Sequence, residues 1–203
     1  MLYLANPTVG TRDAMTNGRL GAMVTPKQGN RIDAGWTWAA DNGCFSRPES
    51  FDLDDYLTWL DRMAPIRPWC LFATAPDRVG DAATTLALSV PVLPELRAIG
   101  YPAALVGQDG LEDLPVPWDA FDVLFLGGST DWKLGLAAAD LARAALARGK
   151  RLHMGRVNSA RRYRYAKALG CHSVDGTYLT FGPDVNLPRL HGWHGQPVQE
   201  TLL

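Results

Sequence analysis

Two aspartates that follow short apolar runs are the residues of this chain best placed to do chemistry. Asp175 comes directly after the run at 171–174 and before Gly176, and no acidic residue occurs between positions 150 and 174. Asp41 follows the run at 36–40 in the same way. A carboxylate in a locally basic stretch can serve as a nucleophile, and a second carboxylate beside it can serve as a general acid or base. The pair therefore indicates bond-breaking chemistry on a bound ligand.

The segment around Asp175 predicts the elements that position it. An apolar run at 152–157 is followed by a basic helical pattern and then by the run at 171–174. This order is strand, helix, strand, with polar residues at the C-terminal ends of both strands. In parallel α/β proteins, ligands bind at those ends.

The same unit recurs along the whole chain. Short apolar runs without alternation indicate strands that are buried on both faces, and most of them are separated by helical patterns. Eight such runs occur, at residues 2–5, 20–24, 36–40, 69–73, 103–106, 122–126, 152–157 and 171–174. They predict a single compact (β/α)8 TIM barrel over residues 1–203. An open doubly wound sheet is the alternative.

The helical patterns are uneven in strength. Helices are expected at 11–17, 51–63 and 134–147, and around 86–96, where Pro91 and Pro94 predict a break or a kink. The first two units are too short to hold full helices. The prolines beyond residue 182 predict an irregular tail.

Composition narrows the class of protein. With 203 residues, the chain is expected to be one domain. Nucleic acid is a possible partner because basic residues are crowded locally, although the net charge of −1 does not argue for it. Its three cysteines lack CxxC spacing and its four histidines are scattered, so neither a metal site nor another cofactor is expected. The sequence has no signal-peptide pattern and no run long enough to span a bilayer. A cytoplasmic location is expected, in the host cytoplasm if a phage encodes the protein, and no membrane partner.

The polar residues at the predicted strand ends could together read a purine. Asp77 or Asp41 could accept hydrogen bonds from its N1–H and N2–H₂ groups, and Gln108 could donate to its carbonyl. Phe45 and Met154 could sandwich the ring. Each residue also has an ordinary explanation as a turn, a strand end or part of the core. The set that a barrel would bring to one face is Asp41, Asp77, Gln108, Gly127, Gly128, Met154, Gly155 and Asp175.

A basic cluster accompanies this set. Its side chains could hold phosphates on either side of a bound nucleotide, and the alternative is a solvated helix face. The cluster comprises Arg156, Arg161, Arg162, Arg164 and Lys167.

Five short motifs, in order, resemble those of the tRNA-guanine transglycosylases. AADNGCFS resembles their SDSGGFQ, LVGQDG their GIVQGG, and FLGGS their GGL segment. RLHMGRV resembles their YLMGVG, and ALGCHSVDGT resembles the stretch with their nucleophilic aspartate. Together the motifs cover about residues 38 to 177. The resemblance implies a (β/α)8 barrel that exchanges guanine for a 7-deazaguanine through a covalent enzyme–ribose intermediate.

The resemblance also implies roles for individual residues. The base-reading aspartate of the family has no clean match, because Ala73 falls near its place, and Asp77 is the substitute. Asp175 would be the nucleophile, and Asp41 the general acid and base. Phe45 and Met154 would pack against the base, and it would form hydrogen bonds with Gln108, Gly127 and Gly128.

Three departures from the tRNA enzymes refine the expectation. The chain is much shorter and lacks their zinc subdomain, and in this it resembles the phage and bacterial 7-deazaguanine DNA transglycosylases of the DpdA type. Lys133 stands where the tRNA enzymes have a glutamate after the GGL loop. A cation there favours the neutral nitrile of preQ0 over the aminomethyl group of preQ1. The expected partners are therefore DNA, single-stranded or with a flipped base, and a free 7-deazaguanine such as preQ0.

Three other interpretations remain open at this point. The same exchange could act on tRNA, or the barrel could bind nucleic acid or a partner protein without catalysis. An unrelated barrel hydrolase or phosphosugar enzyme would instead hold a phosphate near Gly155 and Gly176.

Overall fold

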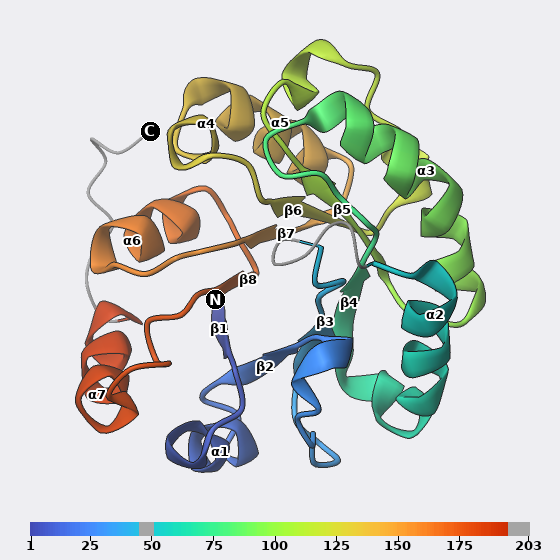
Figure 1. Cartoon of the computed structure of the whole chain (residues 1–203). Helices are drawn as coiled ribbons and strands as arrows, with labels where there is room; N and C mark the ends of the chain where they lie inside the picture. The colour runs from blue at the N-terminus through green and yellow to red at the C-terminus, as the bar shows by residue number, and fades with distance from the viewer. Residues whose placement is uncertain (45–50, 195–203) are drawn as a thin grey trace.

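Eight parallel strands close into a barrel in the computed structural model, which describes residues 1–44 and 51–194 (Figure 1). Each strand pairs with the next one in the chain, and β8 returns to pair with β1, with Asp175 opposite Leu4. The strands are β1 (Leu2–Ala5), β2 (Gly21–Val24), β3 (Trp38–Ala40), β4 (Cys70–Thr74), β5 (Ala103–Gly107), β6 (Val123–Leu126), β7 (Arg151–Met154) and β8 (Ser173–Asp175). The predicted (β/α)8 barrel is confirmed, and the open sheet is excluded.

All eight strands lie within or overlap the apolar runs of the sequence, because each strand is covered on both faces. Side chains such as Phe72, Val106 and Phe125 pack together inside the barrel. Their strand neighbours, Leu124 and Leu126 for example, point outward into the core that separates the barrel from the helices. Burial on both faces explains why the runs show no polar alternation.

Helices surround the barrel (Figure 1). Several begin at a side chain that accepts a hydrogen bond from the first turn, as Asp52, Asp81 and Ser159 do. No helix within residues 1–44 and 51–194 is long and apolar enough to cross a membrane. The α-helices are α1 (Val9–Thr16), α2 (Leu53–Arg62), α3 (Ala82–Ala98), α4 (Thr130–Lys133), α5 (Leu136–Ala147), α6 (Ala160–Ala168) and α7 (Pro183–His194).

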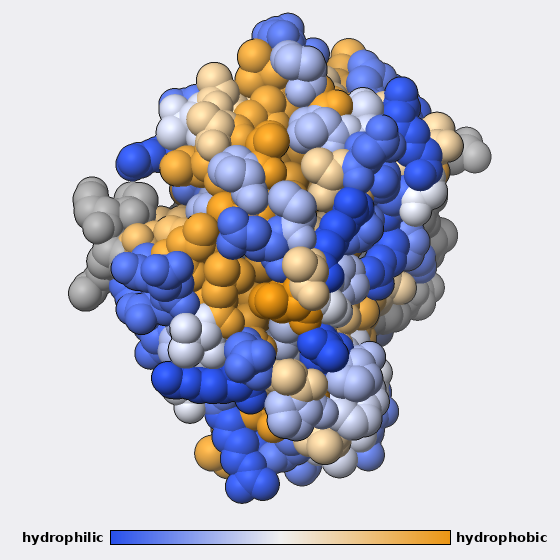
Figure 2. Space-filling view, turned by 90° about the vertical axis from the view of Figure 1, so that its right-hand side faces the viewer, coloured by the Kyte–Doolittle hydropathy of each residue, from blue (hydrophilic) through white to orange (hydrophobic). Residues whose placement is uncertain are grey.

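The predicted break in α3 is wrong, because the helix runs unbroken through Pro91 and Pro94. A proline removes one backbone hydrogen bond, yet Val92 and Leu93 of this helix are buried against the rest of the molecule. Burial of that face outweighs the lost bonds. The outer face of α3 exposes further apolar side chains, and Figure 2 shows apolar and hydrophilic residues intermingled on this side of the molecule.

The irregular tail predicted from about residue 182 is also wrong over α7. Pro183 occupies the first helical position, where a backbone N–H would have no partner within the helix, so proline costs no helical hydrogen bond there. Leu190 and Trp193 are buried, and the Trp193 ring lies 5.8 Å from that of Tyr163 and 4.6 Å from that of Tyr178. The helix therefore completes the outer layer beside α6 and α1.

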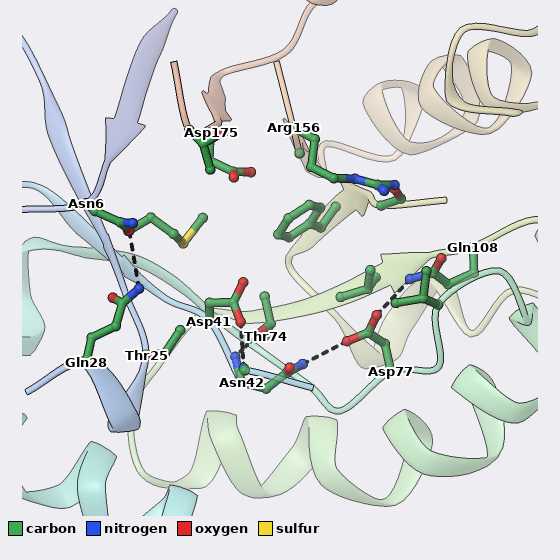
Figure 3. Close-up of a pocket in the computed structure, with 18 residues that line it drawn as sticks. Asn6, Thr25, Gln28, Asp41, Asn42, Thr74, Asp77, Gln108, Arg156 and Asp175 are labelled. Carbon is green, nitrogen blue, oxygen red and sulfur yellow. Dashed lines mark hydrogen bonds between the residues drawn. The ribbon is translucent and has the colours of Figure 1, made fainter. Parts of the chain in front are cut away.

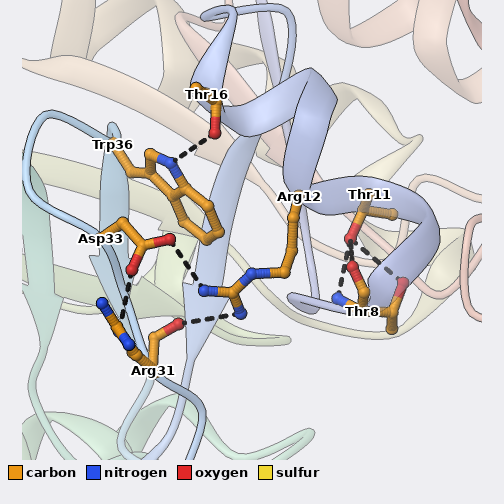
Figure 4. Close-up of polar contacts among 7 residues, drawn as sticks. All are labelled: Thr8, Thr11, Arg12, Thr16, Arg31, Asp33 and Trp36. Atoms are coloured by element: carbon orange, nitrogen blue, oxygen red, sulfur yellow. Dashed lines mark hydrogen bonds and ion pairs between the residues drawn. The ribbon is translucent and has the colours of Figure 1, made fainter.

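The link between β2 and β3 lacks an α-helix, as the short spacing predicted, and has the 3₁₀ turn Pro26–Gln28. Side-chain contacts tie it to α1 instead (Figure 4). Arg12 forms an ion pair with Asp33 at 2.9 Å, and its guanidinium lies 4.7 Å from the centre of the Trp36 ring. The Trp36 indole N–H donates to Thr16 at 3.1 Å. These contacts replace the packing that a crossover helix supplies elsewhere.

Candidate active site

A cavity of about 350 Å³ opens at the C-terminal ends of the strands (Figure 3). Every strand, or the loop directly after it, contributes to its wall. Its size falls in the range typical of small-molecule sites. The polar residues that line it are Asn6, Thr25, Gln28, Asp41, Asn42, Thr74, Asp77, Gln108, Arg156, Asp175 and Thr177.

Asp41 and Asp175 reach into this cavity from opposite sides (Figure 3). Burial raises the pKa of Asp41 to about 6, against a hydrogen bond from the Gly43 N–H that lowers it, and the charge of Asp175 adds to the rise. The Gly43 nitrogen lies 2.6 Å from Asp41 Oδ1. A carboxyl with this pKa can both give and take a proton near neutral pH.

Asp77 is the third carboxylate of the cavity, and two side-chain amides hold it. Gln108 donates to one oxygen at 2.7 Å, and Asn42 donates to the other at 3.0 Å. The Gln108 carbonyl accepts from the Gly80 N–H at 3.0 Å, which fixes the orientation of its amide. Burial raises the pKa of Asp77, and the two amides oppose that rise. The substitute chosen for the missing base-reading aspartate thus lies in the same cavity as Asp41 and Gln108.

Asn42 is a site residue that the sequence did not reveal. Its side chain donates to the Ala75 carbonyl at 2.7 Å as well as to Asp77, and its oxygen accepts from the Cys44 N–H at 2.7 Å. The Asn-Gly pair at 42–43 indicates a turn, and a turn alone explains the asparagine. Its second role, holding the Asp77 carboxylate, was therefore not predicted. A polar side chain next to a candidate catalytic aspartate was the available signal.

The glycine pair after β6 has a different role from the one expected. Both amide N–H groups, of Gly127 and Gly128, donate to the Gly107 carbonyl at 3.0 Å, so neither points at a ligand. A Cβ on Gly127 would lie 2.5 Å from Val106, so glycine is needed for the close approach of two strand ends. Gly127 lines the cavity as backbone, and Gly128 lies outside the described lining.

Arg156, which was predicted to bind a phosphate, has a structural role at the cavity wall. Its guanidinium donates to the carbonyls of Gly127 and Gly128, and its backbone is in the left-handed region with φ of 59°. The side chain lines the cavity. Arg156 therefore builds the wall between the ends of β6 and β7.

Met154 does not pack against a ligand in the cavity, which corrects the prediction. Successive residues of a strand point to opposite sides, and His153 points into the barrel. Met154 therefore faces the helices, where it is fully buried in the core. Phe45, its predicted partner, lies outside the described residues.

Lys133 lies behind the cavity wall rather than in it. The side chain is buried and donates to the Gly155 carbonyl at 2.8 Å. Burial lowers the pKa of Lys133 to about 7, and the positive charge of Arg156 adds to the fall. Because Lys133 lies behind Gly155 and outside the cavity lining, its side chain does not contact a base bound in the cavity.

The rest of the basic cluster lies on α6, which starts just after the end of β7 and so close to the mouth. Arg161 and Lys167 are exposed, and Arg162 donates to the backbone oxygen of Arg156 at 3.2 Å. Arg164 is half-buried. These four α6 residues of the cluster do not contribute to the described lining of the cavity, whereas Arg156 does. No group of three or more His, Cys, Asp or Glu side chains suited to a metal occurs in the described part of the chain.

No protein-family model and no curated protein matches this chain. Among solved structures, it is similar to the Bacillus subtilis YkuI protein, which has an EAL domain and was solved in complex with its substrate c-di-GMP and calcium. The two chains are 15% identical over 81% of this chain and 45% of that one, with a TM-score of 0.46. The chain therefore spans less than half the length of that protein, and a similarity this low carries nothing about function.

Proposed function

We propose that this protein is a transglycosylase that exchanges guanine in DNA for a free 7-deazaguanine base, with Asp175 as nucleophile and Asp41 as general acid and base. The observation that carries the proposal is the arrangement of Asp41 and Asp175 on opposite sides of one cavity at the mouth of the barrel. The resemblance to the transglycosylase motifs supports it, since Gln108 and both aspartates belong to those motifs and line the cavity.

In the first half of the reaction, a carboxylate oxygen of Asp175 attacks C1′ of the nucleotide. The glycosidic C1′–N bond breaks, and its electron pair leaves with the guanine. Protonated Asp41 supplies the proton that the departing base needs, and its pKa of about 6 keeps a protonated fraction available near neutral pH. The product is an ester between Asp175 and the sugar.

In the second half, the incoming base replaces guanine in the cavity. Asp41, now ionised, takes the proton from its ring nitrogen, and that nitrogen attacks C1′. The bond from C1′ to Asp175 breaks, and its electron pair returns to the carboxylate. Two displacements at one carbon retain the configuration, as in retaining glycosidases.

Recognition of the base falls to the side of the cavity with Asp77 and Gln108. The amides fix the Asp77 carboxylate, which has lone pairs left for the N1–H and N2–H₂ donors of a guanine-like edge. The opposite side, with Asn6 and Thr25, is left for the sugar and its phosphates. A base inside a duplex cannot reach this depth, so the substrate is single-stranded or the base is flipped out.

The incoming base proposed is preQ0 rather than preQ1. Arg156 lines the cavity and Lys133 lies behind its wall at Gly155. The charge of Arg156, and that of Lys133 in its protonated fraction, disfavours the charged aminomethyl group of preQ1 and tolerates a neutral nitrile. Competition between the two free bases in the exchange reaction tests this choice, and a preference for preQ1 would contradict it.

The alternative function, a phosphosugar enzyme, is less well supported by the residues at the ends of β7 and β8. A phosphate site there needs free backbone N–H groups. The Thr177 N–H donates to the Asn158 side chain at 2.7 Å, and the Val157 N–H donates to the Asp175 carbonyl at 2.7 Å. A Cβ on Gly176 would lie 2.3 Å from Asn158, so side chains already fill this region.

The decisive experiment is mass spectrometry of nucleosides from DNA and from tRNA after incubation with the protein and free preQ0. We expect the preQ0 deoxynucleoside from DNA with the wild type and none with Asp175→Ala. A denaturation-resistant protein–DNA adduct with the wild type would identify the ester. Incorporation into tRNA alone would transfer the proposal to RNA, and no incorporation into either polymer would contradict it.

A further inference from the structure

A buried histidine lies below the two catalytic carboxylates, inside the barrel. His153 of β7 is fully buried, and its ring makes edge contacts with Phe72 and Phe125, with centroids 4.9 Å and 4.4 Å away. These phenylalanines belong to the apolar cluster that fills the barrel. Burying a polar ring in such surroundings is unfavourable unless its nitrogens are hydrogen-bonded.

Both ring nitrogens of His153 have a partner on the neighbouring strand β8. Nε2 lies 2.9 Å from Asp175 Oδ1, and Nδ1 lies 2.8 Å from the Ser173 hydroxyl. His153 is opposite Ser173 in the register of β7 and β8, and Asp175 is two residues further along the same face. The strand pairing alone therefore aligns the three side chains.

The chemistry of the three groups sets the direction of these hydrogen bonds. A carboxylate only accepts, so a neutral imidazole that bonds to it carries its ring proton on Nε2 and donates it to Asp175. Nδ1 then accepts, and the Ser173 hydroxyl is the donor that it needs. Ser173 is itself buried, so water does not compete for this bond. Asp175, which can only accept, thus selects the Nε2–H tautomer, and the Ser173 hydroxyl provides the donor for Nδ1 and holds the ring in this orientation.

We infer that His153 is a positioning residue for the nucleophile, oriented in turn by Ser173. This inference rests on the proposed function for its catalytic meaning. His153 anchors Oδ1 of Asp175, so Oδ2 is the oxygen that attacks C1′. Gly155 leaves room for this arrangement, since a Cβ there would lie 3.2 Å from Asp175 Oδ1 and 2.6 Å from Phe125.

The anchored oxygen has a role in both halves of the exchange. When Oδ2 bonds to C1′, Oδ1 becomes the carbonyl oxygen of the ester and still accepts from Nε2–H. When the incoming base attacks, the C1′–Oδ2 bond breaks and its electron pair returns to the Asp175 carboxylate. That carboxylate already accepts a hydrogen bond from His153. The bond therefore restrains the nucleophile to one geometry and stabilises it as a leaving group.

Two substitutions separate positioning from simple filling of the barrel. In His153→Gln the side-chain amide can still donate to Asp175, whereas His153→Leu removes the donor at similar volume. We expect kcat to fall about 10- to 100-fold in His153→Leu, with KM for the free base unchanged, and to fall much less in His153→Gln. Unchanged kcat in a folded His153→Leu protein would overturn the inference, as would equal losses in both variants.

A measurement that does not depend on enzymatic activity tests the same geometry. Imidazole ¹⁵N chemical shifts, assigned by the loss of one signal set in His153→Gln, report which ring nitrogen carries the proton. We expect the Nε2–H tautomer in the wild type and also in Ser173→Ala, because Asp175 only accepts, with the Nδ1 signal of the variant moved toward that of a pyridine-type nitrogen without a hydrogen bond. An Nδ1–H tautomer in the wild type would overturn the inference even if base exchange is found. An Nε2–H tautomer without any exchange on DNA or RNA would contradict the proposed function and leave the positioning of Asp175 intact.

Discussion

At the scale of residues, three aspartates in one cavity differ because their neighbours differ. Asp41 is half-buried and accepts from the Gly43 N–H, and desolvation raises its pKa to about 6. Asp77 is held by two amides, and Asp175 by an imidazole. Under the proposed function, one side-chain type would thereby serve as an acid, as the group that recognises the base and as a nucleophile, because different surroundings give carboxylates different properties.

The raised pKa of Asp41 predicts a pH-dependent cost to stability. Between pH 4 and 6 the unfolded chain releases the proton that native Asp41 retains, so stability falls as pH rises and the full cost is present above the native pKa of about 6. Asp41→Asn removes the charge and can still accept from Gly43. We expect it to raise the free energy of unfolding by about 1–3 kcal/mol at pH 7 and to leave it nearly unchanged at pH 4. Urea unfolding at the two pH values measures this, and an equal difference at both would contradict it.

The fixed orientation of Asp77 predicts its effect on base binding. In Asp77→Asn one carboxylate oxygen becomes an NH₂ group, which opposes either the Asn42 or the Gln108 donor and cannot accept from a purine edge. We expect the affinity for free preQ0 to fall at least about tenfold in isothermal titration calorimetry. Asp54→Asn on the exposed face of α2 is the matched control, and equal losses in the two variants would show that Asp77 does not read the base.

At the scale of elements, α7 shows how packing overrides local sequence signals. Its prolines indicate an irregular segment, yet one face of the helix is buried beside α6 and α1. Similarly, Arg12 and its partners hold the link between β2 and β3 where no helix could fit. Contacts between elements, rather than propensity, keep both segments in place.

The burial of α7 predicts a measurable contribution to stability. Leu190 is fully buried, and Leu190→Ala removes its packing and leaves a cavity. We expect the free energy of unfolding to fall by about 3 kcal/mol. The neighbouring Arg189 is exposed, and Arg189→Ala should change it by less than about 0.5 kcal/mol. Equal, small effects of both substitutions in thermal or urea unfolding would show that α7 does not stabilise the barrel.

At the scale of the whole molecule, charge is unevenly distributed. The net charge is only −1, while α6 carries a basic cluster next to the mouth of the barrel. A nearly neutral molecule with one basic side attracts a polyanion in a defined orientation rather than all over its surface. For the proposed DNA substrate, this orientation brings the strand to the cavity.

The exposed part of this cluster predicts the salt dependence of DNA binding. The double substitution of Arg161 and Lys167 by Gln removes two exposed charges from α6. We expect weaker binding of single-stranded DNA and a slope of log affinity against log salt that is shallower by about 1.4, from about 0.7 per phosphate contact. Fluorescence anisotropy at several salt concentrations measures both. Arg62→Gln, on exposed α2, is the control and should change neither, and an unchanged slope in the double variant would place the DNA elsewhere.

The sequence by itself determined the barrel and the side of it that carries the site. Each strand is buried on both faces, so hydrophobic runs mark all eight strands without knowledge of their neighbours. The residue after such a run must lie at the mouth of a parallel barrel. Asp41, Asp77, Gln108 and Asp175 were found in this way, and the structure brings all of them to one cavity.

The tertiary structure alone decided which side chains face that cavity and what each one contacts. The pleat of β7 turns His153 inward and Met154 outward, which a run of apolar letters does not reveal. The partners that define the site come from distant segments: Gln108 binds Asp77 across 31 residues, Asn42 binds Asp77 across 35, and His153 binds Asp175 across 22. Such pairs depend on the register and closure of the barrel, and these are properties of all eight strands together.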